Sequence, residues 1–237
     1  MTETPEAPER DPAERATLQE HVYRKLREAL ISGCYEPGHV LQVRALAEQF
    51  GVSTMPVREA QMRLVAERAL QVLPNRAIRV PILDDAETEE LYALRMLLET
   101  RAGRQAAERF DPAALAALEA LQSEMDAAME RPGIDEALHL NAHFHFAIYR
   151  AGTTSVSLSV IESLWMMSGP IIRAPLRRGA ARLPGSMDKS ARTNHRLMID
   201  GLRRGDGDAV AQAIEADLAV ALAAFRGCGW PAESDAS

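Results

Sequence analysis

The amino-acid sequence predicts a mainly α-helical protein of two units, in which three helices and a β-hairpin are followed by an all-α helical bundle. The chain has 237 residues, more than the roughly 100–200 of one typical domain. Apolar residues recur at helical spacing along most of it, and two short runs rich in aliphatic residues occur within residues 70–80. Aromatic residues make up only 5% of the chain and alanine dominates its second half, which favours a helical bundle over a sheet there.

The first two helices are predicted from apolar spacing and from the residues that end them. One apolar stripe with a four-residue period consists of Leu18, Val22, Leu26 and Leu30. Gly33 and the Pro37-Gly38 pair end this first helix. Residues 43–50 fit a second, short helix, which ends at Gly51.

A third helix and a hairpin complete the first unit. Ser53 is expected to cap the third helix, which runs to about Arg68, by accepting a hydrogen bond from an amide of its first turn. The runs LQVL (70–73) and IRV (78–80) flank residues 74–77, as in a β-hairpin. Three helices and a hairpin describe a winged helix-turn-helix, whose third helix enters the DNA major groove by its N-terminal end.

The charge of the first unit also favours a polyanionic partner. Residues 15–80 contain ten Lys and Arg against six Asp and Glu, although the net charge of the whole chain is -7. A basic segment in an acidic protein is typical of a module that binds nucleic acid. The alternative is a random local excess of basic residues.

The N-terminus and the apolar runs predict a cytoplasmic protein without a membrane span. Residues 1–15 are acidic and Pro-rich, without the basic start and apolar run of a signal peptide. The longest apolar stretches are broken by Ser, Gly, Arg or Asp before the roughly 20 residues that a span requires. Cys34 and Cys228 are far apart, which argues against a disulfide framework and excludes a Cys-rich zinc module. Any metal must therefore be held by His, Asp, Glu or Asn.

The run from Pro37 to Leu83 resembles the DNA-binding domain of the GntR family of bacterial transcription regulators. The matching elements, in order, are Pro37-Gly38, Arg44-Ala45-Leu46-Ala47, Gly51-Val52-Ser53, Pro56-Val57-Arg58-Glu59-Ala60 and Pro74-Asn75-Arg76. The chain departs from the family at Thr54-Met55, where members often have Arg-Thr, at Gln61 in place of Leu, and at Ala77 in place of Gly. These departures concern base preference and the shape of the wing.

The resemblance implies that a set of exposed side chains contacts DNA. The set comprises Arg44, Ser53, Thr54, Met55, Arg58 and Arg76. An Arg can meet a phosphate as a charge or guanine as a bidentate fork, whereas short side chains at a helix N-terminus let a phosphate approach its amides. Arg76 would reach the minor groove or its edge. The alternative is that Arg58 pairs with Glu59 or Glu48 on a solvated surface.

The rest of the chain is predicted to be helical to about Arg226, with loops near residues 111–112, 131–133, 151–152 and 205–207. The predicted division is a disordered acidic tail (1–14), the winged helix-turn-helix (15–81), a linker (82–88), an all-helical unit for effector binding and dimerisation (89–227) and a second tail (228–237).

Polar residues interrupt three apolar stripes of the helical unit. Asn141 and His145 are one helical turn apart on an inward stripe, whereas His139 and His143 lie on a solvated one. His195 and Asp217 interrupt the apolar stripes of two later helices. A buried carboxylate without a partner costs several kcal/mol. Asp217 should therefore meet a cation, a network of donors or a metal.

The helical unit resembles, over residues 85–226, the FCD ligand-binding domain of the FadR-type GntR branch. The resemblance implies a divalent metal, zinc or else nickel or manganese, held by Asn141, His145, His195 and Asp217. Two of these four depart from the commonest set, an Asp-x-x-x-His pair and two later His. The alternative is a set of hydrogen-bonded core groups. Arg95 is implied to bind the effector; otherwise it pairs with an acid at the pocket rim or lies on the surface.

These inferences predict a DNA-binding transcription regulator, not an enzyme. We expect a homodimeric repressor on a pseudo-palindromic double-stranded operator. A metal with one ionised Asp leaves a positive site, so the expected effector is a small carboxylate. A regulator that responds to the metal itself and a metal-dependent hydrolase are the alternatives. The absence of an evident general base and the attached wing argue against catalysis.

Overall fold

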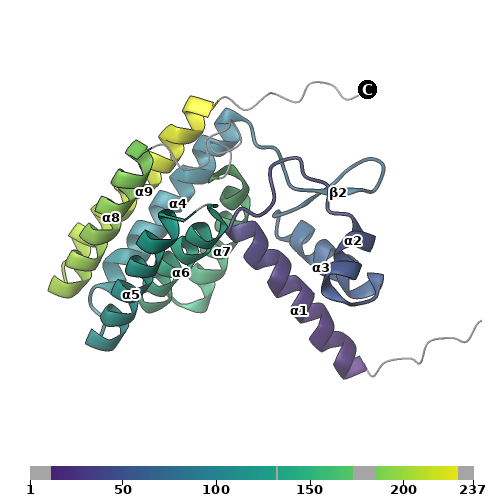
Figure 1. Ribbon diagram of the computed structural model, residues 1–237, viewed down its shortest axis with the longest axis horizontal. Helices are drawn as coiled ribbons and strands as arrows, with labels where there is room; N and C mark the ends of the chain where they lie inside the picture. Colours follow the sequence, from purple (N-terminus) through teal and green to yellow (C-terminus); the bar gives the residue numbers. More distant parts are fainter. Residues whose placement is uncertain (1–11, 132, 173–184, 229–237) are drawn as a thin grey trace, which may run out of the picture.

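The computed structural model describes residues 12–131, 133–172 and 185–228, so most of both predicted tails lies outside the described residues. Three helices and a two-stranded antiparallel hairpin form the first unit (Figure 1). They are α1 (Pro12–Ile31), α2 (Val43–Phe50), α3 (Thr54–Ala66), β1 (Gln71–Val72) and β2 (Ile78–Arg79). The winged helix-turn-helix is confirmed: Val22, Leu26 and Leu30 are fully buried on one face of α1, although Leu18 is half-buried.

The second unit is an all-α bundle, as predicted. Its helices are α4 (Asp85–Ala106), α5 (Pro112–Met129), α6 (Asp135–Gly152), α7 (Ser155–Ile172), α8 (Gly185–Arg204) and α9 (Gly207–Cys228). Helix α4 packs against α6, α7 and α9, and α5 packs against α6 and α8. Side chains from all six helices therefore surround one interior.

Two helices begin earlier than the predicted boundaries. Helix α1 starts at Pro12, inside the segment 1–14 assigned to a tail. Helix α4 starts at Asp85, inside the predicted linker 82–88. The Asp84 carboxylate accepts the Glu87 amide at 2.8 Å, and the Glu87 carboxylate accepts the Asp84 amide at 2.9 Å. This capping box satisfies two amides, so the acidic residues begin a helix instead of joining two units.

Helix α7 connects the two units through close packing. By length and composition alone it could cross a membrane. Here it packs between α1 and α4, and Ile161 and Trp165 are buried. A Cβ added to Gly169 would lie 2.1 Å from the carbonyl oxygen of Leu30, so the α7 and α1 backbones touch. Helix α7 is thus a core helix of the fold.

Candidate functional site

All six side chains predicted to contact DNA are exposed on the first unit. Arg44 lies on α2, Arg58 lies on α3, and Arg76 lies at the tip of the hairpin. Within the described ranges of the chain, none of these three arginines forms an ion pair. The alternative pairing of Arg58 with Glu59 or Glu48 is therefore not what the structure shows, and the guanidinium remains available for a phosphate or a base.

Ser53 occupies the N-cap position of α3, but one detail of the prediction is wrong. Its backbone is extended, with φ -70° and ψ 167°, as an N-cap requires. Its side chain makes no capping hydrogen bond. The first-turn amides of α3, beside Thr54 and Met55, are thus not occupied by the Ser53 hydroxyl and can donate to an anion.

The hairpin tip places Arg76 in a strained backbone conformation. The Arg76 amide donates to the Leu73 carbonyl at 2.8 Å, and the Asn75 side chain accepts the Ala77 amide at 3.0 Å. Arg76 itself has φ +65°. This left-handed conformation costs a non-glycine residue about 1–2 kcal/mol. A charged residue held there at such a cost is typical of a functional position.

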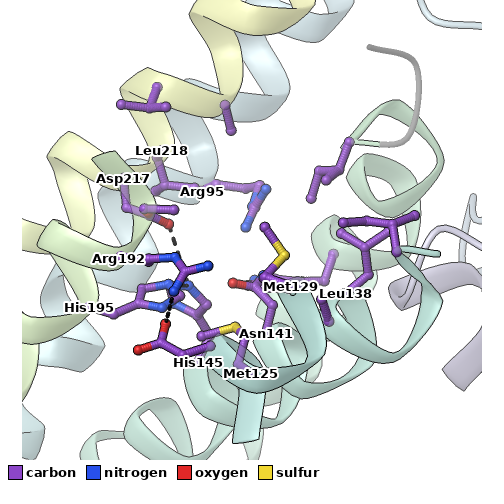
Figure 2. A pocket seen from close by; sticks show the side chains of 18 residues that line it. Arg95, Met125, Met129, Leu138, Asn141, His145, Arg192, His195, Asp217 and Leu218 are labelled. Atoms are coloured by element: carbon purple, nitrogen blue, oxygen red, sulfur yellow. Dashed lines mark hydrogen bonds and ion pairs between the residues drawn. The ribbon is translucent and has the colours of Figure 1, made fainter. Parts of the chain in front are cut away.

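A cavity of about 100 Å³ lies inside the bundle (Figure 2). Much of its wall is apolar, with Met125, Met129 and Leu218 among the contributors. Its polar lining comprises Arg95, Asp126, Asn141, His145, Arg192, His195 and Asp217. The structure therefore brings all four predicted metal ligands and Arg95 to one cavity, from helices α4, α6, α8 and α9.

Three of the four predicted ligands converge closely. The Nε2 atoms of His145 and His195 are 3.2 Å apart, and His145 Nε2 is 3.4 Å from Asp217 Oδ2. The three ligand atoms all lie within 4.8 Å of one another. Asn141 lies one helical turn before His145 and also faces the cavity (Figure 2). The Asp217 side chain is 16% exposed, so the carboxylate opens toward the cavity while the two imidazoles are buried.

Hydrogen bonds behind each imidazole determine where its proton resides. The Tyr149 hydroxyl donates to Glu99 Oε2 at 2.5 Å, so its oxygen accepts from His145 Nδ1 at 3.1 Å. Gln122 Nε2 donates to Asp126 Oδ1 at 2.9 Å, so Gln122 Oε1 accepts from His195 Nδ1 at 2.9 Å. We assign both protons to Nδ1 on this network. Because Nδ1 is engaged behind each ring, Nε2 is the atom that can present a lone pair to a cation in the cavity.

The arrangement suits a divalent cation. Two imidazole lone pairs and a carboxylate oxygen face one another, and such donors bind zinc, nickel or manganese. Nitrogen ligands about 2.0–2.1 Å from a tetrahedral ion lie roughly 3.3 Å apart. The two separations that involve His145, 3.2 Å to His195 and 3.4 Å to Asp217, agree with this spacing. Hydrogen-bonded Nδ1 atoms behind the ligands are the usual support of a metal site.

The ionisation states agree with the same arrangement. Burial lowers the pKa of His195 to about 4, against the opposing charge of Asp217. His195 is therefore neutral at pH 7. Although burial raises it, the pKa of Asp217 stays below its ordinary value because His145, His195 and Asn194 stabilise the carboxylate. An ionised Asp217 and a neutral His195 thus face the cavity beside His145.

Arg95 lies in the wall of the same cavity and is only 2% exposed. Its Nε donates to Glu99 Oε1 at 2.7 Å, and its guanidinium carbon lies 4.6 Å from the centre of the Trp165 ring. Of the predicted alternatives, a surface position is wrong, and the acid that pairs with Arg95 is in the core, not at a rim. The Arg95 Nη1 atom is buried and has no hydrogen-bond partner among the residues that the structure describes. It is a free donor for an anionic ligand.

Sequence reasoning missed the residues that support the ligands. These are Glu99, Gln122 and Tyr149. Glu99 follows Arg95 by one helical turn and Tyr149 follows His145 by one turn, so the spacing that placed the ligands could have identified both. Gln122 has no such signal, because its helix α5 carries none of the predicted ligands.

The comparisons with known proteins agree with this geometry. Residues 90–220 match the FCD domain family, and residues 18–80 match the family described as bacterial regulatory proteins, gntR family. The HTH-type transcriptional regulator McbR of Escherichia coli is 36% identical over 154 residues, covering 65% of this chain and 69% of McbR. The gluconate operon transcriptional repressor of Bacillus licheniformis is 28% identical over 201 residues, covering 82% and 79% of the two chains.

A solved structure supports the fold over nearly the whole molecule. The structure of E. coli McbR/YncC superposes with a TM-score of 0.80 at 28% identity, covering 89% of this chain and 97% of that one. These relatives are named as transcription regulators, not as enzymes. The chain therefore belongs to the GntR family of bacterial transcription regulators, in the FadR-type branch whose C-terminal unit is an FCD domain, and it is not an enzyme.

Proposed function

We propose that the chain is a cytoplasmic repressor whose affinity for its DNA operator is controlled by a small organic acid. In this proposal residues 15–81 bind the operator and residues 89–227 bind the acid and dimerise the protein. The observation that carries it is the cavity in which His145, His195 and Asp217 converge beside an unpartnered Arg95 nitrogen. A relative named for the operon of gluconate, a hydroxy acid, is consistent with an effector of this class.

The proposed DNA contacts divide by their chemistry. Arg58 lies on the helix expected in the major groove, where it can read guanine, whereas Arg44 on α2 is placed for a phosphate. Ser53, Thr54 and Met55 surround the free amides at the start of α3. Arg76, at the hairpin tip, would reach the minor groove or its edge. Loss of a base contact should cost about 1–3 kcal/mol and relax specificity, whereas loss of a phosphate contact should weaken all sequences alike.

A divalent metal, with zinc as the first candidate and nickel or manganese as others, would be held by Asn141, His145, His195 and Asp217. When bound, it would supply a positive charge with open coordination positions beside the cavity. The chain's own residues then orient the acid: Arg95 Nη1 donates to one carboxylate, and the apolar wall excludes water around the remainder of the ligand. A hydroxy-carboxylate has oxygens for both polar groups of the cavity, the metal ligands with their ion and the Arg95 guanidinium.

A homodimer is proposed from exposed apolar side chains on neighbouring helices. Leu94 and Leu97 are 44% and 67% exposed on α4, and Val156 and Val160 are 74% and 46% exposed on α7. Helices α4 and α7 pack against each other, so these side chains can be covered together by a second copy. Two winged units related by a two-fold axis require a pseudo-palindromic operator.

The test is a mobility-shift assay of operator binding with candidate acids, on metal-loaded and chelator-treated protein. We expect an acid to change operator binding only in the metal-loaded protein. Arg95→Met should abolish this change, and the acid should be recovered chemically intact. Arg58→Ala should lose operator binding, whereas Arg204→Ala, which removes an exposed charge on α8, should not. A response to metal without any acid would indicate a metal sensor, and conversion of the acid would indicate a hydrolase. Either result would overturn the proposal.

A further inference from the structure

Another face of α6 borders a second hollow, which lies between the two units of the protein. Its volume is about 270 Å³, and helix α1 of the DNA-binding unit forms the opposite wall. We call it the α1–α6 hollow. Its charged and imidazole side chains are those of Arg24, Arg27, Glu28, His139, His143 and Arg150. None of these six side chains lines the first cavity, so the hollow is a separate feature.

The hollow is positively charged although the chain as a whole is acidic. Arg24 and Arg150 are exposed, and neither forms an ion pair with any residue that the structure describes. The nearby acids are already engaged, because Glu28 lies 3.4 Å from Lys25 and Glu162 pairs with Arg27. Two guanidinium groups on facing helices therefore lack a counter-charge.

Two imidazoles, those of His139 and His143, also line the hollow from α6. The rings of His139 and His143 have their centroids 4.2 Å apart. Both side chains are exposed, and each imidazole carries an N–H that can donate to an anion. The arrangement combines guanidinium cations with imidazole donors, as anion sites do.

We propose that the α1–α6 hollow binds a phosphate group. Arg24 and Arg150 approach from different helices, so a ligand that satisfies both, together with an imidazole, needs acceptor oxygens in several directions. A tetrahedral phosphate has them, whereas a planar carboxylate has two oxygens in one plane. The group could belong to a small phosphorylated molecule or to the DNA backbone.

A phosphate in this position would bridge the two units. Helix α1 belongs to the DNA-binding unit, and α6 also carries Asn141 and His145 on the face that lines the first cavity. Bound phosphate therefore fixes the orientation of α1 on the helix that holds half of the candidate metal ligands. The consequence is a change in operator affinity that does not require an acid in the first cavity.

The experiment titrates inorganic phosphate into the full-length protein and follows the NMR resonances of the imidazole rings. The chain has six histidines, few enough for their resonances to be resolved and assigned. The resonances of His139 and His143 should shift saturably, and sodium chloride at equal ionic strength should not reproduce the shift. Combining Arg24→Gln with Arg150→Gln should raise the midpoint at least tenfold, whereas Arg204→Gln should leave it unchanged. Equal melting temperatures would show that the variants fold, since both arginines are exposed.

Operator binding then separates the two sources of phosphate. If DNA supplies the group, the double variant binds operator more weakly and with a smaller salt dependence, and inorganic phosphate competes. If a free molecule supplies it, the double variant binds operator normally without phosphate and loses only the response to it. The absence of a saturable shift, or an unchanged midpoint in the double variant, would overturn the proposal.

Discussion

Replacing Glu99 by Gln should strongly destabilise the protein, because it leaves the charge of Arg95 unpaired in the core. The two side chains are 2% and 0% exposed, and they form a two-pronged pair with N–O distances of 2.7 and 3.3 Å. Although burial lowers it, the pKa of Arg95 lies above its ordinary value because of Glu99, so the guanidinium cannot escape by losing its proton. Breaking a buried pair in this way costs about 3–5 kcal/mol.

The measurement is chemical unfolding of the full-length variant beside a matched control. Glu119→Gln makes the same chemical change in a surface pair with Arg203, where both side chains are about half exposed (44% and 51%). An exposed pair contributes about 0–1 kcal/mol. Glu99→Gln should therefore lose several times more stability than Glu119→Gln. If the two variants are equally stable, water reaches Arg95, and its guanidinium is not a desolvated charge that needs an anionic partner.

The same variant also reports on the effector. With Glu99 neutralised, a carboxylate bound in the cavity becomes the counter-ion of Arg95. A carboxylate that binds there should therefore raise the melting temperature of Glu99→Gln more than that of the native protein, since a ligand stabilises by its affinity for the folded state. An equal or smaller increase would mean that the carboxylate does not reach Arg95.

Three further predictions concern the hairpin, the hollow and the contact between units. Arg76→Gly should raise stability by about 1 kcal/mol by relieving the left-handed backbone, yet weaken operator binding; loss of both would refute the strain argument. The pKa of His143, measured by NMR, should lie below its ordinary value and rise in Arg150→Gln, since that change removes a neighbouring charge. Gly169→Ala should cost about 1–3 kcal/mol and speed hydrogen exchange at the end of α1, because its Cβ overlaps the Leu30 carbonyl; unchanged exchange would show that the helices separate freely.

Helical periodicity predicted which faces carry the candidate ligands, but it could not bring them together. The spacing of Asn141 and His145 places both on one inward stripe of α6, and the same reasoning places His195 and Asp217 inward on α8 and α9. The spacing of residues along one helix tells on which side of that helix a side chain lies. It does not tell which other helices that side faces. Their common site was predicted from the resemblance to the FCD domain, and the structure shows three of them within 4.8 Å.

The start of α4 and the partner of Arg95 were not predicted, although the local sequence indicates both. The run Asp84-Asp85-Ala86-Glu87, with Asp84 followed three positions later by Glu87, is a capping-box pattern, and it begins α4 within the segment predicted to be a linker. Glu99 lies four positions after Arg95 on the same stripe, which is the spacing of an ion pair within a helix. The α1–α6 hollow had no local signal, because it exists only where the two units pack.

If the proposed effector binds in the bundle cavity, α7 connects that cavity to the DNA-binding unit. Trp165 of α7 lines the cavity and lies against the Arg95 guanidinium, at 4.6 Å. One turn further along the helix, Gly169 touches the backbone of α1 at Leu30 and Ile31. Packed backbones without an intervening side chain cannot absorb a displacement by changing rotamers. An acid that draws Arg95 away from Trp165 therefore acts on a helix in direct contact with the DNA-binding unit, and Gly169→Ala should disturb this response without touching the cavity.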